Sequence, residues 1–145
     1  MEKNIVSWRT VTSLCSKLVE RLKDKYPNIN DYSIMGLSRG GLVPSVMVSN
    51  MLNIRKVHSL GIKSYDNEQQ GAPELYQVPN LSMLSKILVI DDISDTGDSF
   101  INTKDMLEGK DVITASLFIK SNTKYKPDVY IKSVDTAVWV VFPWE

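Results

Sequence analysis

The amino-acid sequence predicts an α/β fold in which helices flank a mostly parallel sheet. Strand-like and helix-like segments alternate along the chain, and this alternation is typical of repeated β-α-β units. Residues 86–90 consist almost wholly of Ile, Leu and Val, as do parallel strands that are buried on both faces. The 145 residues are expected to form a single domain, residues 1–145, because domains commonly run to about 100–200 residues.

Composition and charge exclude several classes of protein. Hydrophobic residues make up 43% and charged residues 23% of the chain, which is ordinary for a soluble globular protein. Seventeen Lys and Arg balance seventeen Asp and Glu, so we expect no nucleic-acid partner. No apolar run approaches the roughly 20 residues of a membrane span, and the N-terminus is unlike a signal peptide. The single cysteine, Cys15, suits a reducing compartment, and we expect a cytoplasmic protein.

The first segments predict a lead-in and an amphipathic helix. Residues 5–8 are expected to form a short strand or an extended lead-in. Apolar side chains then recur at a three-four spacing, which predicts a helix that begins at Thr10 or Thr12 as its cap and ends near Pro27. Its apolar stripe consists of Val11, Leu14, Cys15, Leu18, Val19 and Leu22. Because Cys15 lies in this stripe, we expect it to pack in the core.

The middle of the chain predicts two strands, a helix and a long loop. Residues 32–36 and 57–65 are strand-like, and residues 42–52 are helical with Pro44 in the first turn. Residues 66–80 hold Asn, Gln, Gly and Pro and predict a loop, which at that length is usually functional or disordered.

The C-terminal half predicts a further helix and two more strands. The helix spans residues 98–107 and ends near Gly109, and the strands span residues 112–119 and 129–133. In parallel sheets of this kind, ligands bind at the carboxyl ends of the strands. The loops that follow the strands are therefore the places to look for chemistry.

The loop after residues 86–90 carries the strongest chemical signal. Asp91, Asp92 and Asp95 crowd five positions, and such like charges favour a cation or a hydroxyl-rich partner between them. A helix follows, and the small residues at its start let backbone N–H groups bind an anion. The residues that open this helix are Thr96, Gly97, Asp98 and Ser99. A phosphorylated sugar matches both halves of the loop.

Acids at the end of a strand also occur in solvated turns, in receiver domains and in phosphatases. The acids here could be solvated turn formers, with Asp95 or Asp98 as a helix cap, but this accounts for one acid better than for the whole stretch. A response-regulator receiver has its acidic pair near the first strand, whereas this pair follows a late strand. Phosphatases with an aspartyl nucleophile use Asp-x-Asp, whereas the acids here are adjacent and three apart. Neither the receiver pattern nor the phosphatase pattern fits well.

The stretch 90–99 resembles the motif with which type I phosphoribosyltransferases bind 5-phosphoribosyl 1-pyrophosphate (PRPP). Residues 36–44 resemble the pyrophosphate loop of the bacterial xanthine-guanine enzymes. Residues 4–8 resemble the first strand of these enzymes, and residues 63–66 resemble the entry to their mobile catalytic loop. Residues 139–145 resemble the end of the chain that binds the base. The resemblance is collinear over nearly the whole chain. It implies the type I phosphoribosyltransferase fold, with a small hood made from residues 1–9 and 134–145.

The resemblance implies transfer of the 5-phosphoribosyl group from PRPP to a 6-oxopurine base (guanine, xanthine or hypoxanthine), which is purine salvage. Asp91 and Asp92 would bind the ribose, and Asp92 would also bind Mg²⁺, with Asp91 reaching the metal through water. The 5-phosphate would be held by Asp95, Thr96, Gly97, Asp98 and Ser99. The pyrophosphate would be held by Ser38, Arg39, Gly40 and Gly41. A cis peptide is expected at Ser38–Arg39.

The resemblance also assigns the residues around the base. Asp95 would bond the purine nitrogen opposite the reacting one and act as a general acid or base. Lys120 would donate to the 6-oxo group, and Trp139, with Val140 beside it, would stack on the base. Taken singly, Lys120 could instead end a strand in solvent, and Trp139 could be a core or interface residue.

The mobile loop about residues 66–80, entered through Ser64 and Tyr65, would close over PRPP and exclude water. Two positions depart from the family pattern. Asp98 puts a negative charge inside the phosphate loop, so its carboxylate must point away from the phosphate. Val141 stands where guanine-preferring relatives carry Glu, which leaves the choice of base open.

Two different functions remain compatible with these residues. One is a transferase of the same fold with a different acceptor, and the second is a PRPP-sensing regulator that does not catalyse. The resemblance further implies a homodimer through the early helices, or a tetramer.

Overall fold

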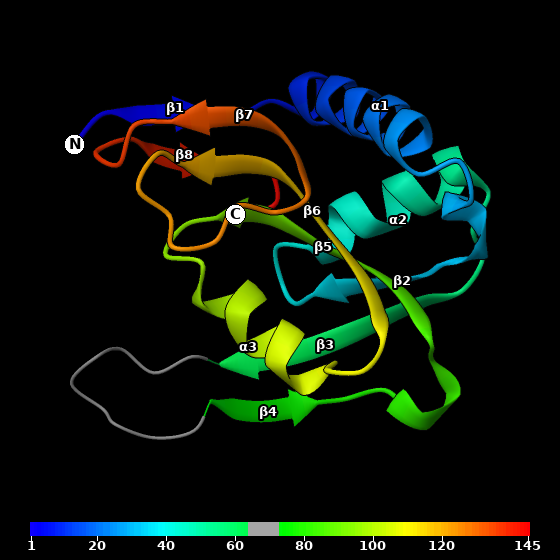
Figure 1. Ribbon diagram of the computed structural model, residues 1–145. Coiled ribbons are helices and arrows are strands. Elements are labelled where there is room, and N and C mark those ends of the chain that lie inside the picture. Colours follow the sequence, from blue (N-terminus) through cyan, green and yellow to red (C-terminus); the bar gives the residue numbers. More distant parts are fainter. Residues whose placement is uncertain (64–72) are drawn as a thin grey trace.

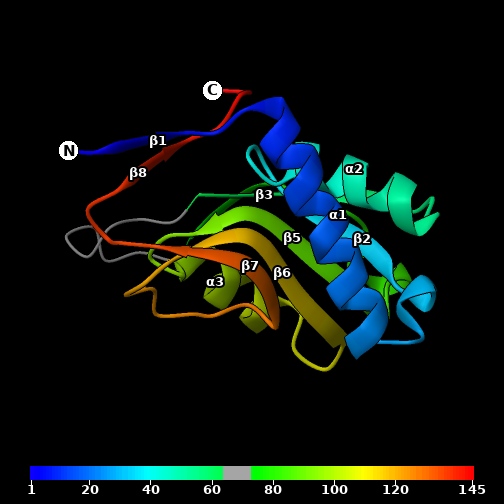
Figure 2. The same cartoon turned by 90° about the horizontal axis from the view of Figure 1, so that it is seen from above.

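The computed structural model describes residues 1–63 and 73–145. They form a six-stranded sheet and a separate two-stranded sheet (Figure 1). Helices α1 (Trp8–Lys25) and α2 (Leu42–Leu52) cover one face of the larger sheet, and α3 (Asp98–Met106) covers the other (Figure 2). The predicted α/β class is confirmed.

The larger sheet is parallel except at one edge. Its strand order is β4-β3-β2-β5-β6-β7, and β4 alone runs antiparallel to its neighbour. The strands are β2 (Ser33–Leu37), β3 (Val57–Lys63), β4 (Glu74–Gln77), β5 (Lys86–Ser94), β6 (Asp111–Lys120) and β7 (Val129–Val134). Short 3₁₀ helices span Ile29–Asp31 and Leu81–Met83. The carboxyl ends of β2, β5 and β6 therefore lie along one edge.

Strand β5 contributes side chains to the hydrophobic cores on both faces of the larger sheet. Leu88 and Ile90 pack in the core under α1 and α2, while Ile87 and Val89 pack in the core under α3. This division follows from the alternation of side chains along a strand. All four side chains are fully buried, as the run of Ile, Leu and Val predicts.

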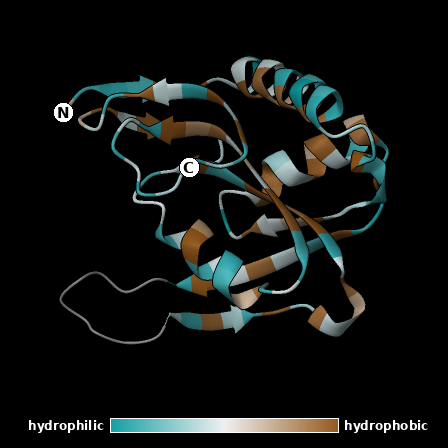
Figure 3. Ribbon diagram, viewed as in Figure 1, coloured by the Kyte–Doolittle hydropathy of each residue, from teal (hydrophilic) through white to brown (hydrophobic). Residues whose placement is uncertain are grey.

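Helix α1 begins earlier than expected, and its cap is Ser7 rather than Thr10 or Thr12. Ser7 has an extended backbone, and its hydroxyl oxygen accepts a hydrogen bond from the Thr10 N–H at 3.1 Å. Trp8 consequently opens the helix and belongs to no strand. The predicted apolar stripe is buried, and Figure 3 shows hydrophilic and hydrophobic residues alternating along the helix. Burial raises the pKa of the Cys15 thiol to about 11, so this core cysteine stays protonated at neutral pH.

Part of the predicted loop at residues 66–80 is regular structure. Glu74–Gln77 form β4, which pairs with β3. All four β4 side chains are exposed, so the strand lacks the buried alternation by which a strand is found in a sequence. Ser64 and Tyr65 lie outside the described residues.

Strand β5 is also longer than predicted. It continues past Ile90 to Ser94, and Asp91, Ile93 and Ser94 pair with residues of β6. Backbone pairing with a neighbouring strand does not need apolar side chains, so a hydrophobic pattern cannot reveal this extension. The acids therefore stand on the end of a strand, and only residues 95–97 connect it to α3.

The two chain ends pair with each other. Strand β1 (Lys3–Ile5) runs parallel to β8 (Trp139–Val141), with Lys3 opposite Trp139. Both views place this small sheet on the side where β6 and β7 end (Figures 1 and 2). That it serves as a hood remains a prediction. No helix of the described residues is long and apolar enough to cross a membrane.

Candidate active site

Two predicted loops meet at the carboxyl edge of the sheet. Residues 38–41 follow β2, and the acids stand at the end of the adjacent strand β5. A β-carbon built at Gly40 would overlap the Asp92 carboxylate, and one built at Gly41 would overlap the Ile90 carbonyl oxygen. Only glycine lets the two segments come this close. The structure thus brings the predicted pyrophosphate loop and the acidic motif into direct contact.

The loop after β2 has the expected cis peptide between Ser38 and Arg39. The Ser38 hydroxyl lies 3.3 Å from the Leu60 carbonyl oxygen and 2.9 Å from the Tyr76 hydroxyl. The Tyr76 ring lies against Gly61, where any β-carbon would overlap it. Arg39 is exposed, so its guanidinium is available to an anion.

Asp91 and Asp92 are half-buried, and each carboxylate accepts a hydrogen bond from the next residue's backbone. The Asp92 N–H donates to Asp91 Oδ1 at 2.8 Å, and the Ile93 N–H donates to Asp92 Oδ1 at 2.7 Å. Burial, reinforced by the neighbouring Asp92 charge, raises the pKa of Asp91 well above its ordinary range. Burial likewise raises the pKa of Asp92, with a smaller contribution from the charge of Glu145. A bound cation or hydroxyl donors would favour the ionised forms of this pair.

The predicted phosphate loop surrounds a small cavity of about 70 Å³. Gly97 has a left-handed backbone with φ of 94°, and a β-carbon there would lie 2.6 Å from the Tyr125 nitrogen. Asp98 opens α3, so the first-turn N–H groups of this helix lack partners within the helix. The cavity is lined by Asp91, residues 93–97, Ser99 and Phe100. These features suit a small anion.

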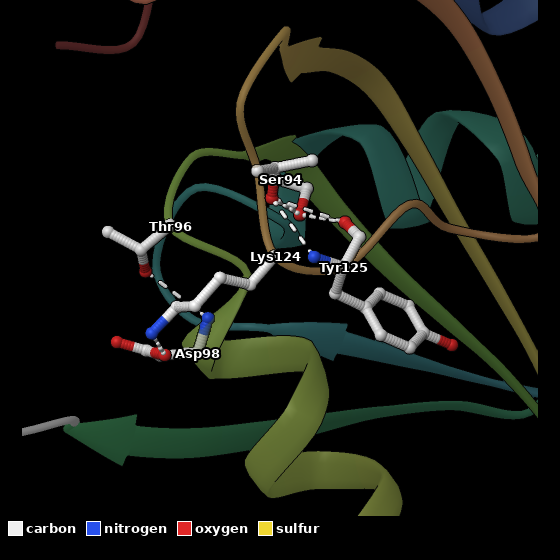
Figure 4. Close-up of polar contacts among 6 residues, drawn as sticks. Ser94, Thr96, Asp98, Lys124 and Tyr125 are labelled. Carbon is white, nitrogen blue, oxygen red and sulfur yellow. Dashed lines mark hydrogen bonds and ion pairs between the residues drawn. The ribbon is translucent and has the colours of Figure 1, made fainter.

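A second segment, residues 123–125, packs against the back of this loop (Figure 4). The Ser94 hydroxyl donates to the Tyr125 carbonyl oxygen at 2.7 Å and lies 3.0 Å from the Thr123 hydroxyl. The Lys124 N–H donates to the Thr96 carbonyl oxygen at 2.9 Å. The predicted phosphate loop is therefore held at its first residues by the segment that follows β6.

The predicted base-binding residues occupy contrasting positions. Lys120 ends β6 and is 8% exposed, and its ammonium donates to the carbonyl oxygens of Thr136 and Val138. The alternative of a solvated strand-end lysine is therefore wrong. Trp139 is 48% exposed with the Lys3 ammonium 4.8 Å from its ring centroid, so it is no core residue, whereas Val140 is buried.

The strand register relates Asp95 to Lys120. Asp95 follows Ser94, whose register partner Ile119 directly precedes Lys120. Both residues thus lie at the same edge of two neighbouring strands. The Asp95 side chain is exposed there, where a base could reach it. The catalytic and base-binding roles of these residues remain predictions.

The acid pair offers oxygen ligands of the kind that Mg²⁺ prefers. Among the described residues, no group of three or more His, Cys, Asp or Glu side chains is arranged to hold a metal. The donor set fits an ion that takes one or two carboxylates and completes its shell with substrate oxygens and water.

A wider hollow, of about 510 Å³, lies elsewhere, between α1 and β7. Its lining includes no predicted site residue and consists of Arg21, Asp24, Lys25, Asp128, Val129 and Tyr130. Arg21 and Lys25 donate to the carbonyl oxygens of Tyr130 and Asp128. These cations cover backbone groups of an edge strand, which protects such an edge from pairing with other chains.

Sequence reasoning missed two contributions to the site. Tyr76 lies on β4, whose four exposed side chains lack the buried alternation by which a strand is found in a sequence. Residues 123–125 follow β6 at its carboxyl end, so the rule that ligands bind at carboxyl ends was a usable signal.

Comparisons with known proteins agree with this geometry. The chain is 31% identical over 144 residues to the xanthine-guanine phosphoribosyltransferase of Chromohalobacter salexigens, which covers 97% of this chain and 82% of that protein. It is 29% identical over 144 residues to the enzyme of that name from Cereibacter sphaeroides, over 97% of this chain and 85% of that protein. The solved structure of Helicobacter pylori xanthine-guanine-hypoxanthine phosphoribosyltransferase matches with a TM-score of 0.84 and 28% identity, over 99% of this chain and 94% of that one.

The family model described as the phosphoribosyl transferase domain matches residues 1–145. The resemblance inferred from the motifs, and the fold it implied, are thereby confirmed. The chain belongs to the phosphoribosyl transferase domain family.

Proposed function

We propose that this protein transfers the 5-phosphoribosyl group of PRPP to a 6-oxopurine base, giving a nucleoside monophosphate and pyrophosphate. One observation carries the proposal: the acid pair Asp91–Asp92 lies between two loops suited to anions, residues 38–41 and 95–99. PRPP has the same order of groups, with ribose hydroxyls between a pyrophosphate and a 5-phosphate. Family membership and the names of the relatives support this activity.

Separate residues would stabilise the ribose, the leaving pyrophosphate and the purine base during the reaction. The bond from ribose C1 to the pyrophosphate oxygen breaks, and its electron pair leaves with the pyrophosphate. A purine ring nitrogen supplies the electron pair of the new bond to C1, and the purine loses to Asp95 the proton held by the opposite ring nitrogen. Positive charge grows on the ribose near Asp91 and Asp92, while negative charge grows on the pyrophosphate near Arg39. Asp95, at the edge where the base enters, holds or moves a proton at the opposite purine nitrogen.

The proposed cofactor is Mg²⁺, which when bound would neutralise charge on the leaving pyrophosphate. Asp92 would supply a carboxylate oxygen directly, and Asp91 would reach the ion through water. The raised pKa values of both carboxyls mean that cation binding and deprotonation are linked.

The class of base is proposed from three residues. Asp95 and Lys120 together offer polar partners for a purine ring nitrogen and a 6-oxo group. Val141, half-buried in β8, offers no side-chain acceptor for a 2-amino group. The relatives' names cover xanthine and guanine, and in one case hypoxanthine. We therefore expect a 6-oxopurine, with hypoxanthine used at least as well as guanine.

The test is pyrophosphate release from PRPP and Mg²⁺ with guanine, xanthine, hypoxanthine, adenine and orotate offered singly. Release with a 6-oxopurine alone supports the proposal, and the ranking of the three bases tests the role of Val141. Release with none, from protein that binds PRPP, favours a different acceptor or a PRPP-sensing regulator. Absence of PRPP binding would contradict the role of the acid pair.

The proposed assembly is a homodimer, with a tetramer as the alternative. Ile5 and Trp8, near the start of the chain, are 77% and 53% exposed although they are large and apolar. Light scattering tests the proposal, and a monomeric mass at working concentration would contradict it.

A further inference from the structure

We infer that the affinity of this protein for PRPP is tuned by the charge balance of one ion pair, Asp98 and Lys124, beside the phosphate loop. The Lys124 ammonium lies 2.6 Å from Asp98 Oδ1. The inference rests on the proposed function, because it requires the 5-phosphate of PRPP to bind at residues 95–99. Lys124 acts through its charge on the bound phosphate, in balance with the charge of Asp98, and it is no catalytic residue.

The negative charge of Asp98 opposes the binding of a phosphate, and residues 95–99 include no positively charged side chain to offset it. It opens α3, where a carboxylate interacts favourably with the positive end of the helix. A bound phosphate uses the same helix end, and so the two anions would compete and repel each other. A second carboxylate, that of Asp95, stands three residues away and is exposed. Without a cation nearby, this loop would disfavour a phosphate dianion.

Lys124 is held at the place where it offsets this charge. Its backbone N–H donates to the Thr96 carbonyl oxygen at 2.9 Å, inside the phosphate loop. Its neighbours Thr123 and Tyr125 contact the hydroxyl of Ser94, the residue that directly precedes the loop. Figure 4 shows the Lys124 side chain reaching along the loop to Asp98, whose N–H bonds the Thr96 hydroxyl. The position of the ammonium is therefore set by the backbone as well as by the ion pair.

The exposure of the ion pair indicates whether its effect should appear in ligand affinity or in folding stability. The Lys124 and Asp98 side chains are 57% and 34% exposed, and ion pairs as open as this contribute little to folding stability. A unit charge a few ångström from a dianion, in surroundings close to water, changes binding by roughly tenfold. The effect should therefore appear in the binding of phosphate-bearing ligands and not in the melting temperature.

The experiment measures PRPP binding by calorimetry in the presence of Mg²⁺ and without a base. We expect Lys124→Ala to weaken binding by roughly tenfold and Asp98→Asn to tighten it, because each shifts the local charge by one unit in opposite directions. The double variant should return to within about twofold of wild type. Lys124→Arg keeps the charge and should keep the affinity. Raising the salt concentration should shrink all of these differences.

Lys126→Ala is the matched control, because Lys126 is an exposed lysine two residues farther along the same connection. It should bind PRPP as the wild type does. Melting temperatures of all variants should stay within a few degrees of wild type, with Asp98→Asn lowest because it loses its interaction with the start of α3. Agreement within this range excludes unfolding as the cause of weak binding.

Three results would overturn the inference. Weaker binding by both single variants would mean that the ion pair clamps the loop mechanically. A double variant as weak as Lys124→Ala would mean that Lys124 bonds the phosphate directly. Equal affinities throughout would mean that the pair has no role. If the wild type binds no PRPP, a titration with ribose 5-phosphate distinguishes the two failures. Equal binding of ribose 5-phosphate by the wild type and the charge variants refutes this inference. Absence of ribose 5-phosphate binding refutes the proposed phosphate site.

Discussion

Two halves of the same strand, β5, differ sharply. In the first half, residues 87–90 are apolar and fully buried, and they belong to the cores on both faces of the sheet. In the second half, Asp91, Asp92 and Ile93 are half-buried, yet the backbone still pairs with β6 up to Ser94. The hydrogen-bonded ladder continues where the apolar packing stops. A rigid element thus carries carboxylates out of the core and to the site.

The two halves also differ in their expected effect on stability. Burial of the apolar side chains stabilises the fold, since each removes apolar surface from water. Burial of the acids has the opposite sign, because it raises the pKa of both Asp91 and Asp92 and so disfavours their ionised forms. The second half of β5 is therefore expected to lower the free energy of unfolding while it supplies groups for binding. This trade-off is common in active sites.

The largest expected effect comes from the acid just beyond the strand. Asp95→Asn should lower turnover by roughly 10²–10⁴-fold, the usual contribution of a general acid or base. Binding of PRPP should be spared, because the backbone N–H groups of the loop remain. Pyrophosphate release and calorimetry measure the two quantities. Unchanged turnover would remove Asp95 from the chemistry.

The apolar half is tested by Leu88→Ala. Leu88 is fully buried in the core under α1 and α2, so its truncation should destabilise the protein by about 2–5 kcal/mol. Affinity for PRPP should stay the same in the folded fraction, because Leu88 lies in the core and not at the carboxyl edge of the sheet. Urea denaturation gives the free energy of unfolding. Loss of affinity at unchanged stability would contradict the division of β5 into two halves.

The acidic half is tested by Asp91→Asn, which keeps the oxygen that accepts from the Asp92 N–H. The ordinary pKa of Asp91 is 3.8, and burial followed by the Asp92 charge raises it in the folded protein. Above pH 3.8 the folded state therefore holds more protons than the unfolded state, so wild-type stability falls as the pH rises through the window up to the raised pKa.

Asp91→Asn should remove this loss. The variant should melt at a higher temperature than the wild type at neutral pH, and the difference should vanish below about pH 4. It should also bind PRPP more weakly, because one carboxylate for the ribose is gone. Thermal melts across pH, without ligand, test the first expectation. A variant that is less stable at neutral pH would show that the acid stabilises the strand.

The smallest expected effect is that of Tyr76→Phe. The variant loses the hydroxyl that lies 2.9 Å from the Ser38 hydroxyl, and one such hydrogen bond is worth about 0.5–1.5 kcal/mol. The KM for PRPP should rise by roughly two- to tenfold at nearly constant kcat. Tyr130→Phe, on the distant edge strand β7, serves as the control and should leave the KM unchanged. A changed kcat with an unchanged KM would exclude a role for Tyr76 in holding the pyrophosphate loop.

The sequence indicated those parts of the candidate site whose residues lie close together along the chain. The acids, Gly97 and the helix that follows them lie within a short stretch, and they predicted a site for a phosphorylated sugar. The Ser38–Arg39 cis peptide was likewise expected from the resemblance alone. The ion pair of Lys124 with Asp98 was not visible, because it joins the start of α3 to the connection after β6, which only strand pairing brings together.

The sequence by itself determined the α/β class, the buried stretch of β5 and the family, because each rests on residue types at short spacings. Only the tertiary structure decided that β5 continues through the acids, that β4 exists and that Gly40 lies against Asp92. The physical reason is that backbone pairing and close packing depend on a partner distant in the chain. No local pattern encodes the identity of that partner.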